Sequence, residues 1–270
     1  MRAFEFVPEG TSGCNVKAWI HEQNKRLEVK QRMHPAVIIC PGGGYSFVSD
    51  REAEPVASAY FAAGYNTYIL RYAVGCEGAK NFRPLCQLAA TIAEIRKNAE
   101  AWFTVKDQIA VCGFSAGGHL AASLGTLFNE EKFLKVFGRT ENIRPEAMIL
   151  GYPVITADEY AHAGSIENVS GSAIGSEEYA WFGLDKHVDS ETPPAFLWHT
   201  APDGTVPVEN SLKMCAALSA AKVPFELHVL PKGGHGMSTC TKEVATYSSY
   251  NARWVDWSIA WLNALFQFEL

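Results

Sequence analysis

Short apolar runs rich in β-branched residues alternate with longer segments of helical periodicity along most of the chain. This alternation is typical of βαβ units arranged around a mostly parallel sheet. Ala36–Cys40 is apolar throughout, as expected of a strand that is buried on both faces. Eight strands are predicted: Phe4–Val7, Asn15–Ile20, Ala36–Cys40, Asn66–Tyr72, Ile109–Gly113, Ala147–Gly151, Ala195–Thr200 and Glu226–Leu230. The sequence therefore predicts an α/β fold.

The segments between these strands repeat their apolar residues at intervals of three and four, as one face of an amphipathic helix does. Leu85, Leu88, Ile92 and Ile95 form such a face, and Pro84 suits the first turn of that helix. Helices are expected at 52–63, from 84 to about 102, at 115–128, at 209–221 and in a tryptophan-rich segment that ends near 266. Helices that alternate with parallel strands cover both faces of the sheet.

One segment, from about Ile155 to Pro194, does not follow the alternation. It is rich in Gly, Ser, Ala and Glu, with aromatic side chains scattered among them. An interruption of this length in a compact domain is usually a functional insertion rather than a slack loop. We therefore expect a single domain over residues 1–270, with residues 155–194 inserted before the seventh strand as a cap over the site.

Charge and cysteine content argue against several classes of protein. The net charge is −6 without a long run of one sign, so nucleic acid is not expected as a partner. No apolar run approaches the roughly 18 residues of a membrane span, and the first residues lack the apolar segment of a signal peptide. The seven cysteines show no paired short spacing, which argues against disulfides and a zinc site. We expect a cytoplasmic protein without metal or cofactor.

The segment Gly113-Phe114-Ser115-Ala116-Gly117 follows a predicted strand and opens a predicted helix. In that context the pattern Gly-x-Ser-x-Gly is typical of a nucleophile elbow, in which small neighbours let the chain turn sharply around the serine. The alternative is a glycine-rich turn whose serine caps the helix. The flanking strand and helix, together with the partners described next, favour Ser115 as a catalytic nucleophile.

A glycine-rich loop follows the strand Ala36–Cys40, with the sequence Pro41-Gly42-Gly43-Gly44-Tyr45. Consecutive glycines let backbone N–H groups turn toward a developing oxyanion, and such a loop acts together with the N–H of the residue after the nucleophile. Gly43, Gly44 and Ala116 are therefore the candidate donors. A plain turn and a phosphate-binding loop are the alternatives, but the loop lacks the Gly-Lys-Ser/Thr ending that a phosphate loop requires.

A histidine and a carboxylate complete a nucleophile-elbow site, and they follow the serine in the order acid, then histidine. His235 lies in a glycine-flanked loop after the last predicted strand and is the candidate base. Asp203 follows the penultimate strand and can orient its Nδ1–H, although an Asp-Gly turn can also be purely structural. The remaining histidines precede the elbow, fall within predicted helices or strands, as His119 and His199 do, or lie in the insertion, where His162 could contact only substrate.

Together these residues resemble the α/β-hydrolase esterases, and among them the small bacterial enzymes known as acetyl-xylan esterases or sugar hydrolases. The resemblance extends from about Ala36 to Asn263. Two positions depart from related enzymes: Cys40-Pro41 stands where hormone-sensitive-lipase-like members usually have His-Gly, and Pro202 where many have a second acid. Six segments carry the resemblance: Cys40–Tyr45, Arg51–Pro55, Gly113–Ala121, Tyr152–Thr156, Thr192–Thr200 and Asp203–Asn210.

The resemblance implies a serine carboxylesterase that removes acetyl groups from sugars or xylo-oligosaccharides through an acyl-enzyme. Its partner would be a small ester, above all an acetylated sugar. Tyr45, Tyr152, Trp181 and Phe182 are candidates to line the acyl or sugar pocket, with a place in the core as the alternative. A general short-chain carboxylesterase or lipase, and a ligand-binding homologue without catalysis, are the alternative functions.

Overall fold

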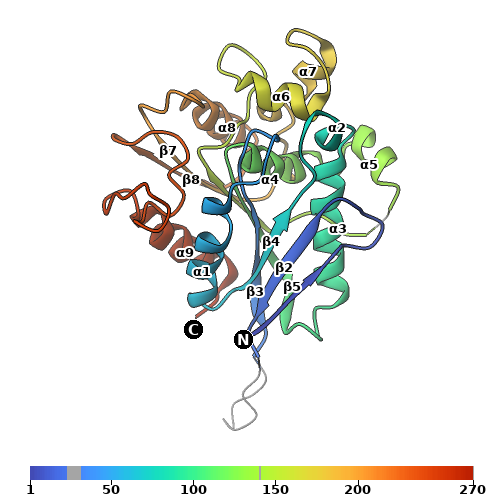
Figure 1. Ribbon diagram of the computed structural model, residues 1–270, viewed down its shortest axis with the longest axis vertical. Coiled ribbons are helices and arrows are strands. Elements are labelled where there is room, and N and C mark those ends of the chain that lie inside the picture. The colour runs from blue at the N-terminus through green and yellow to red at the C-terminus, as the bar shows by residue number, and fades with distance from the viewer. Residues whose placement is uncertain (23–31, 140, 270) are drawn as a thin grey trace.

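Eight strands form one sheet at the centre of the protein, in the order β1-β2-β4-β3-β5-β6-β7-β8 (Figure 1). The computed structural model describes residues 1–22, 32–139 and 141–269. β2 runs antiparallel to its neighbours β1 and β4, and all other neighbouring strands are parallel. The strands are β1 (Arg2–Phe6), β2 (Asn15–Ile20), β3 (His34–Cys40), β4 (Asn66–Arg71), β5 (Thr104–Phe114), β6 (Ala147–Gly151), β7 (Ala195–Thr200) and β8 (Phe225–Leu230). The predicted eight-stranded, mostly parallel sheet is confirmed.

Helices cover both faces of this sheet, as the alternation predicts. Buried side chains of α1 and α9 belong to one apolar cluster, and those of α3, α4 and α8 belong to a second cluster on the opposite face. The helices outside the insertion are α1 (Glu54–Ala62), α2 (Cys76–Ala79), α3 (Arg83–Lys97), α4 (Ala116–Leu127), α5 (Glu131–Phe137), α8 (Glu209–Ala220) and α9 (Arg253–Phe266). No helix in the described part of the chain is long and apolar enough to span a bilayer.

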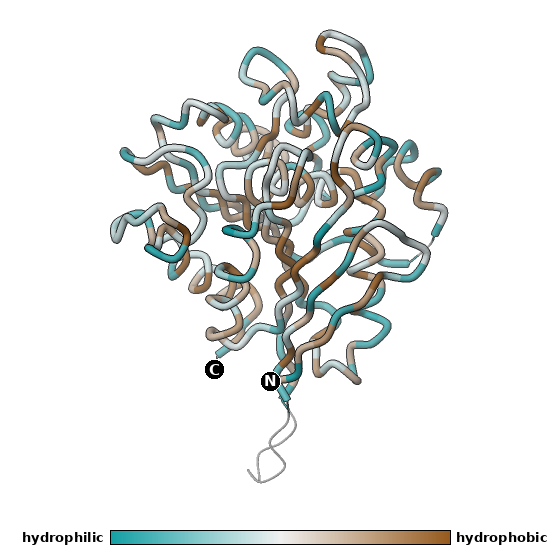
Figure 2. The backbone as a smooth tube through the Cα atoms, viewed as in Figure 1, coloured by the Kyte–Doolittle hydropathy of each residue, from teal (hydrophilic) through white to brown (hydrophobic). Residues whose placement is uncertain are grey.

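The central strand β3 separates the two apolar clusters. Val37 and Ile39 belong to the cluster shared with α1 and α9, whereas Ile38 and Cys40 belong to the cluster on the other face. Successive strand residues point to opposite faces, so a strand that is apolar at every position is buried on both. Figure 2 shows the result as brown strands in the middle of the molecule, surrounded by paler and teal segments.

Several elements begin at residues other than those predicted, and the differences at β5 and α1 have clear causes. β5 begins at Thr104 rather than at Ile109, because Thr104 pairs with His34 ahead of an irregularity in the register. The polar residues of this extension show no apolar alternation, which hid it in the sequence. The helix expected from Glu52 begins at Glu54 instead, with a proline in its first turn, and residues 50–52 form the separate 3-10 helix η1. Glu52 is thereby buried, with 3% of its surface exposed.

The segment between β6 and β7 contains α6 (Ala163–Ser170), α7 (Glu177–Trp181) and the 3-10 helix η2 (Leu184–Lys186). In Figure 1, α6 and α7 lie at the top of the molecule, next to α2 and α5. The Asn168 side-chain amide on α6 donates to the Gly44 carbonyl at 2.9 Å and to the Ser46 hydroxyl at 3.0 Å. The inserted segment therefore contacts the glycine loop that follows β3.

Candidate active site

The candidate catalytic residues follow three parallel strands at the same edge of the sheet. Ser115 comes directly after β5, Asp203 follows β7, and His235 follows β8. The glycine loop follows β3, which pairs with β5. Because the carboxyl ends of parallel strands share one edge, segments far apart in sequence meet there, as ligand sites of open α/β sheets generally do.

Ser115 has the strained backbone of a sharp strand-to-helix turn, with φ 53° and ψ −121°. Its N–H donates to the Gly151 carbonyl at 3.1 Å. Its own carbonyl accepts the N–H groups of His119 and Val154, each at 3.0 Å. Such strain costs on the order of 1–3 kcal/mol and persists only where the surroundings enforce it. These three backbone hydrogen bonds enforce it here.

The glycines around the serine are required by close backbone contacts. A Cβ atom on Gly117 would lie 2.0 Å from the Cys40 carbonyl oxygen, and one on Gly113 would lie 2.1 Å from the Gly117 carbonyl oxygen. A side chain on Gly117 would push the turn away from β3, and one on Gly113 would push α4 away from β5. The glycines of the motif thus allow α4 to start directly against the neighbouring strand.

His235 joins the serine and the carboxylate in one hydrogen-bonded chain. Its Nε2 lies 2.8 Å from Ser115 Oγ, and its Nδ1 lies 2.8 Å from Asp203 Oδ2. An ionised carboxylate only accepts hydrogen bonds, so Nδ1 carries the proton and Nε2 is the acceptor that faces the serine hydroxyl. The structure thus brings together the three residues that the sequence analysis selected, in an arrangement capable of activating a hydroxyl group.

Asp203 is held as an anion by several donors. Its Oδ1 accepts the N–H groups of Thr205 at 2.9 Å and Val206 at 3.0 Å. Burial raises the pKa of the Asp203 carboxyl, but hydrogen bonds from His199 and His235 outweigh burial and hold the pKa well below its usual range. The carboxylate therefore stays charged wherever a histidine base is neutral.

Three backbone N–H groups next to the serine are free to bind an oxyanion. Among the described residues, the N–H groups of Gly43, Gly44 and Ala116 have no hydrogen-bond acceptor. The Gly42 N–H is different, because it donates to Glu52 Oε2 at 2.8 Å. Gly43 has φ 127°, and a Cβ there would lie 2.1 Å from the Phe47 carbonyl oxygen, so only glycine fits.

Glu52 is a buried residue of the site that motif reasoning missed. Its Oε2 accepts from Gly42 in the glycine loop, and its Oε1 accepts from the Tyr152 hydroxyl at 2.6 Å. The Tyr152 oxygen in turn accepts the Ser238 N–H, three residues after His235, at 2.8 Å. One carboxylate thus connects the glycine loop to the loop of the candidate base. Its only signal in the sequence was its place in a segment shared with the esterases.

Tyr45 and Tyr152 do not line the pocket, contrary to the expectation from the sequence. Both side chains have no exposed surface. The Tyr45 hydroxyl lies 2.9 Å from His119 Nδ1, and His119 Nε2 lies 3.0 Å from the Phe182 carbonyl oxygen. We call Glu52, Tyr152, Tyr45 and His119 the buried frame. Their hydrogen bonds satisfy buried polar groups next to the candidate catalytic residues, which is why these tyrosines face inward.

Trp181 and Phe182 are also outside the pocket. Phe182 is 3% exposed and packs on Phe82, with ring centroids 5.6 Å apart. Trp181 makes an edge contact with Phe82 and lies under the Lys132 ammonium, 4.4 Å from its ring centroid. These aromatics anchor the inserted segment to the core, because burying an apolar ring there is more favourable than exposing it at the rim.

The pocket next to Ser115 has a volume of about 320 Å³. It is lined by residues of the glycine loop, the η1 segment, the turn after β5, the insertion, the loop after β7 and the His235 loop: Gly43, Gly44, Ser46, Phe47, Ser49, Arg51, Glu52, Ser115, His162, Thr205, His235 and Gly236. Phe47, with 60% of its surface exposed, Arg51 and His162 form what we call the rim. The sequence predicts that His162 could contact only substrate, and its motifs point to neither Phe47 nor Arg51 as a pocket residue.

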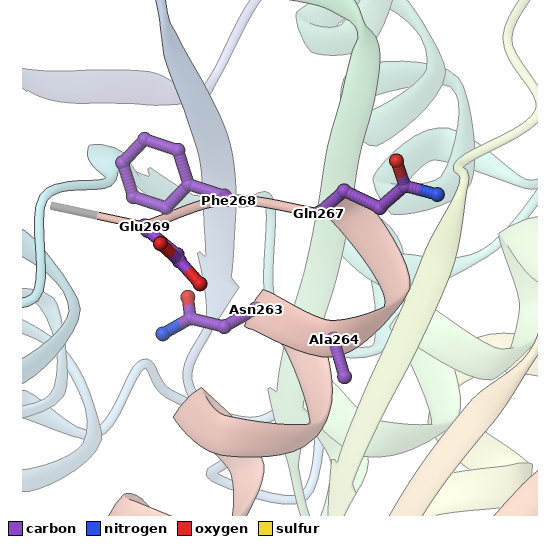
Figure 3. A pocket seen from close by; sticks show the side chains of 5 residues that line it. All are labelled: Asn263, Ala264, Gln267, Phe268 and Glu269. Carbon is purple, nitrogen blue, oxygen red and sulfur yellow. The ribbon is translucent and has the colours of Figure 1, made fainter.

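A second hollow lies at the end of α9 and is lined by Asn263, Ala264, Gln267, Phe268 and Glu269 (Figure 3). No serine, cysteine or histidine is among these described lining residues. It lacks the nucleophile and base found beside Ser115. Within the described residues, no group of three or more His, Cys, Asp or Glu side chains is placed to hold a metal ion.

Comparison with known proteins identifies the family. The BD-FAE family model matches residues 26–218. The chain belongs to the BD-FAE family. A crystal structure of an acetyl ester-xyloside bifunctional hydrolase from Caldicellulosiruptor lactoaceticus is 31% identical, with a TM-score of 0.82, and the match covers 98% of this chain and 92% of that one. The predicted α/β-hydrolase fold is thereby confirmed for this BD-FAE member.

The names of two curated relatives of this BD-FAE chain also refer to xylan. Endo-1,4-beta-xylanase B of Butyrivibrio fibrisolvens is 32% identical over 89% of this chain and 36% of its own length. An acetylxylan esterase of Xylanibacter ruminicola is 29% identical over 74% of this chain and 40% of its own length. The chain thus spans well under half the length of both relatives. The predicted enzyme class, a serine ester hydrolase, is confirmed by the acetylxylan esterase together with the acetyl ester-xyloside hydrolase structure, which matches over 92% of its own length.

Proposed function

We propose that this chain is a serine carboxylesterase that removes acetyl groups from sugars or xylo-oligosaccharides, with Ser115, His235 and Asp203 as its catalytic residues. One observation carries the proposal. A hydroxyl, an imidazole and a carboxylate are joined by two 2.8 Å contacts, beside three backbone N–H groups without an acceptor. This arrangement supplies a nucleophile, a base and an oxyanion site at one place. A binding protein without catalysis has no need of all three.

In the first half of the reaction, Ser115 Oγ attacks the ester carbonyl carbon while His235 Nε2 takes the hydroxyl proton. The carbonyl oxygen becomes an oxyanion, which the N–H groups of Ala116 and of Gly43 or Gly44 bind. The tetrahedral intermediate then collapses as the imidazolium gives its proton to the leaving alcohol. Asp203 stabilises the positive charge on the imidazolium throughout. The products are the free alcohol and acetyl-Ser115.

In the second half, water replaces the alcohol. His235 takes a proton from the water as it attacks the acetyl carbon, the same N–H groups bind the second oxyanion, and the proton returns to Ser115 Oγ as acetate leaves. No group besides these side chains, the backbone donors and water is needed to balance either step.

Two observations of different kinds support a sugar as the part of the substrate that carries the acetyl group. The relatives are named as a xylanase, an acetylxylan esterase and an acetyl ester-xyloside bifunctional hydrolase, so their names refer to xylan, xylosides and acetyl esters. Phe47 also presents an exposed aromatic ring beside the polar groups of the rim, and ligand pockets commonly combine aromatic side chains with a few polar groups. A sugar ring has an apolar face and a polar edge, which match these two features.

The inserted segment 155–194 functions in this proposal as a cap that shapes the alcohol side of the pocket. His162 lines the pocket, and Asn168 holds the Gly44 carbonyl. Together with the eight-stranded core, the cap forms a single domain. A variant that lacks the cap would lose His162 from the pocket lining and the Asn168 hydrogen bond to the glycine loop.

The test compares the protein with Ser115→Ala on p-nitrophenyl acetate, p-nitrophenyl octanoate and acetylated xylo-oligosaccharides. The expected result is hydrolysis of both acetyl substrates, poor hydrolysis of the octanoate, and a loss of roughly 10⁴-fold or more in kcat for Ser115→Ala. Full activity of Ser115→Ala would overturn the catalytic assignment. A preference for octanoate would instead favour a general carboxylesterase or lipase and remove only the sugar assignment.

A further inference from the structure

The Arg51 side chain stands at the rim of the catalytic pocket. Arg51 is exposed, lines the same cavity as Ser115 and His235, and lies on η1 directly before the buried Glu52. Its Nη2 is 3.1 Å from the position that a Cβ on Gly236 would occupy. The guanidinium therefore lies against the residue that follows the candidate base.

The acids near Arg51 in the sequence all have other partners. Asp50 pairs with Arg71 at 2.8 Å, and Glu54 pairs with Lys17 at 3.0 Å. Glu52 directs its two oxygens to a backbone N–H and a tyrosine hydroxyl, as described above. Among the described residues, no acceptor and no aromatic ring contacts the Arg51 guanidinium. Five N–H donors are thus available at the mouth of the pocket.

Arg51 is also the single fixed positive charge among the described residues that line this pocket. Burial and the nearby His235 lower the pKa of His162, so that ring is neutral at pH 7. One guanidinium balances one negative charge, and its planar fork matches the two oxygens of a carboxylate. A doubly charged phosphate would leave one charge without a partner.

The position of Arg51 indicates which part of an ester it would contact. His235 has to give its proton to the leaving alcohol, so the alcohol lies on the His235 side of the pocket. Arg51 lies on that side too, against Gly236. The acyl group is bound to Ser115, next to the N–H groups of the oxyanion site. A carboxylate held by Arg51 therefore belongs to the alcohol.

We infer that Arg51 binds a carboxylate on the sugar that carries the acetyl group, so that the preferred substrates are acetylated sugars containing a uronic acid. This inference rests on the proposed esterase function and specifies its substrate. Glu52 does not take the place of this ligand, because its carboxylate is 3% exposed and its two oxygens accept from the Gly42 N–H and the Tyr152 hydroxyl.

The kinetic test compares acetylated methyl glucuronoside with acetylated methyl glucoside, which differ in one carboxylate, by measuring acetate release. The protein should show a kcat/KM about fivefold higher for the glucuronoside, as expected of a partly exposed charge-assisted contact. Arg51→Gln should bring this ratio close to one, and Arg51→Lys should retain part of it. Arg83→Gln, an exposed arginine outside the pocket lining, should leave the ratio unchanged. Added salt should reduce the ratio.

A binding measurement separates this inference from the esterase proposal. Ser115→Ala keeps the pocket and removes the nucleophile, so the same two compounds can be titrated into it and followed by NMR. The glucuronoside should bind more tightly, and the double variant with Arg51→Gln should lose the difference. Equal affinity for both compounds, or a preference that survives Arg51→Gln, would overturn the inference. Failure to hydrolyse p-nitrophenyl acetate would overturn the esterase proposal alone.

Discussion

The buried frame and the rim both adjoin the proposed catalytic residues, and they are held in place in different ways. Each frame side chain is nearly or fully buried and hydrogen-bonded to groups from another part of the chain, as Tyr45 is to His119. In the rim, Phe47 is 60% exposed and Arg51 has no partner among the described residues. The frame fixes geometry, whereas the rim keeps its binding groups available to a ligand.

This contrast has an energetic basis. A buried polar group without a partner costs about 1–3 kcal/mol, so the frame is stable only with all its hydrogen bonds formed. An exposed arginine or phenylalanine is hydrated and carries no such penalty. Substitutions in the frame should therefore change kcat or stability, and substitutions at the rim should change the choice of substrate.

The largest effect is expected for Asp203→Asn, because Asp203 is itself one of the proposed catalytic residues. The amide can donate to His235 Nδ1, which favours the wrong imidazole tautomer, so kcat should fall by about 10⁴-fold. The measurement is p-nitrophenyl acetate hydrolysis at pH 7. Asp256→Asn, an exposed aspartate on α9, is the control and should retain full activity. A loss of less than tenfold in Asp203→Asn would exclude Asp203 as the orienting group.

Glu52→Gln tests whether the frame positions the oxyanion loop. Two donors, Gly42 N–H and Tyr152 O–H, face the carboxylate, and an amide offers them a single acceptor oxygen. We expect kcat to fall by about 30-fold with little change in KM, which is less than the full loss of an oxyanion donor. Glu54→Gln is a matched control, because Glu54 pairs on the surface with Lys17 and Arg71. Equal effects of the two substitutions would contradict a positioning role.

The sequence could predict those residues whose positions are determined by their neighbours in the chain. The strand run Ala36–Cys40 has to be buried on both faces, and the pattern around Ser115 needs glycine where the backbones of two elements touch. Both requirements are visible in a few consecutive letters. The predicted family and fold were accordingly confirmed. Asp203 and His235 were selected by their order after Ser115 and by the strands they follow.

The residues that could not be predicted depend on contacts between distant segments. Glu52 connects to Tyr152, 100 positions along the chain, and no spacing rule links the two. Tyr45 and Phe47 are neighbouring aromatics of one loop, but Tyr45 has no exposed surface and Phe47 is 60% exposed. Aromatic composition cannot separate a core ring from a pocket ring. The choice is made by a buried partner, His119 in the case of Tyr45.

Protonation of His119 makes the free energy of unfolding depend on pH. Burial lowers the pKa of His119 to about 4, whereas an unfolded histidine titrates near 6.5. As the pH falls from about 6.5 to about 4, the unfolded chain takes up a proton at this position and the folded protein does not, so the free energy of unfolding decreases. The loss due to His119 is at most about 3 kcal/mol. This loss of stability should be complete near pH 4.

Urea unfolding at pH 7, 5.5 and 4.5 measures this loss. His119→Gln removes the titrating group, so the variant should be less stable than the protein at pH 7 but should lose less stability on acidification. Burial also lowers the pKa of His21, to about 4, so a smaller pH dependence should remain in the variant. Parallel pH profiles for the two proteins would show that His119 does not couple the frame to protonation.

The smallest effect is expected at the rim, in Phe47→Leu. Replacing the ring removes apolar area that a sugar would cover, worth about 1 kcal/mol, so KM for acetylated xylo-oligosaccharides should rise about fivefold with kcat nearly constant. Phe47→Tyr keeps the ring and should retain the original KM. Tyr247, which is 64% exposed and outside the pocket lining, provides a control in Tyr247→Leu. If Phe47→Leu instead lowered kcat on every ester, Phe47 would belong with the frame, because its N–H and carbonyl lie next to Gly43 in the oxyanion loop.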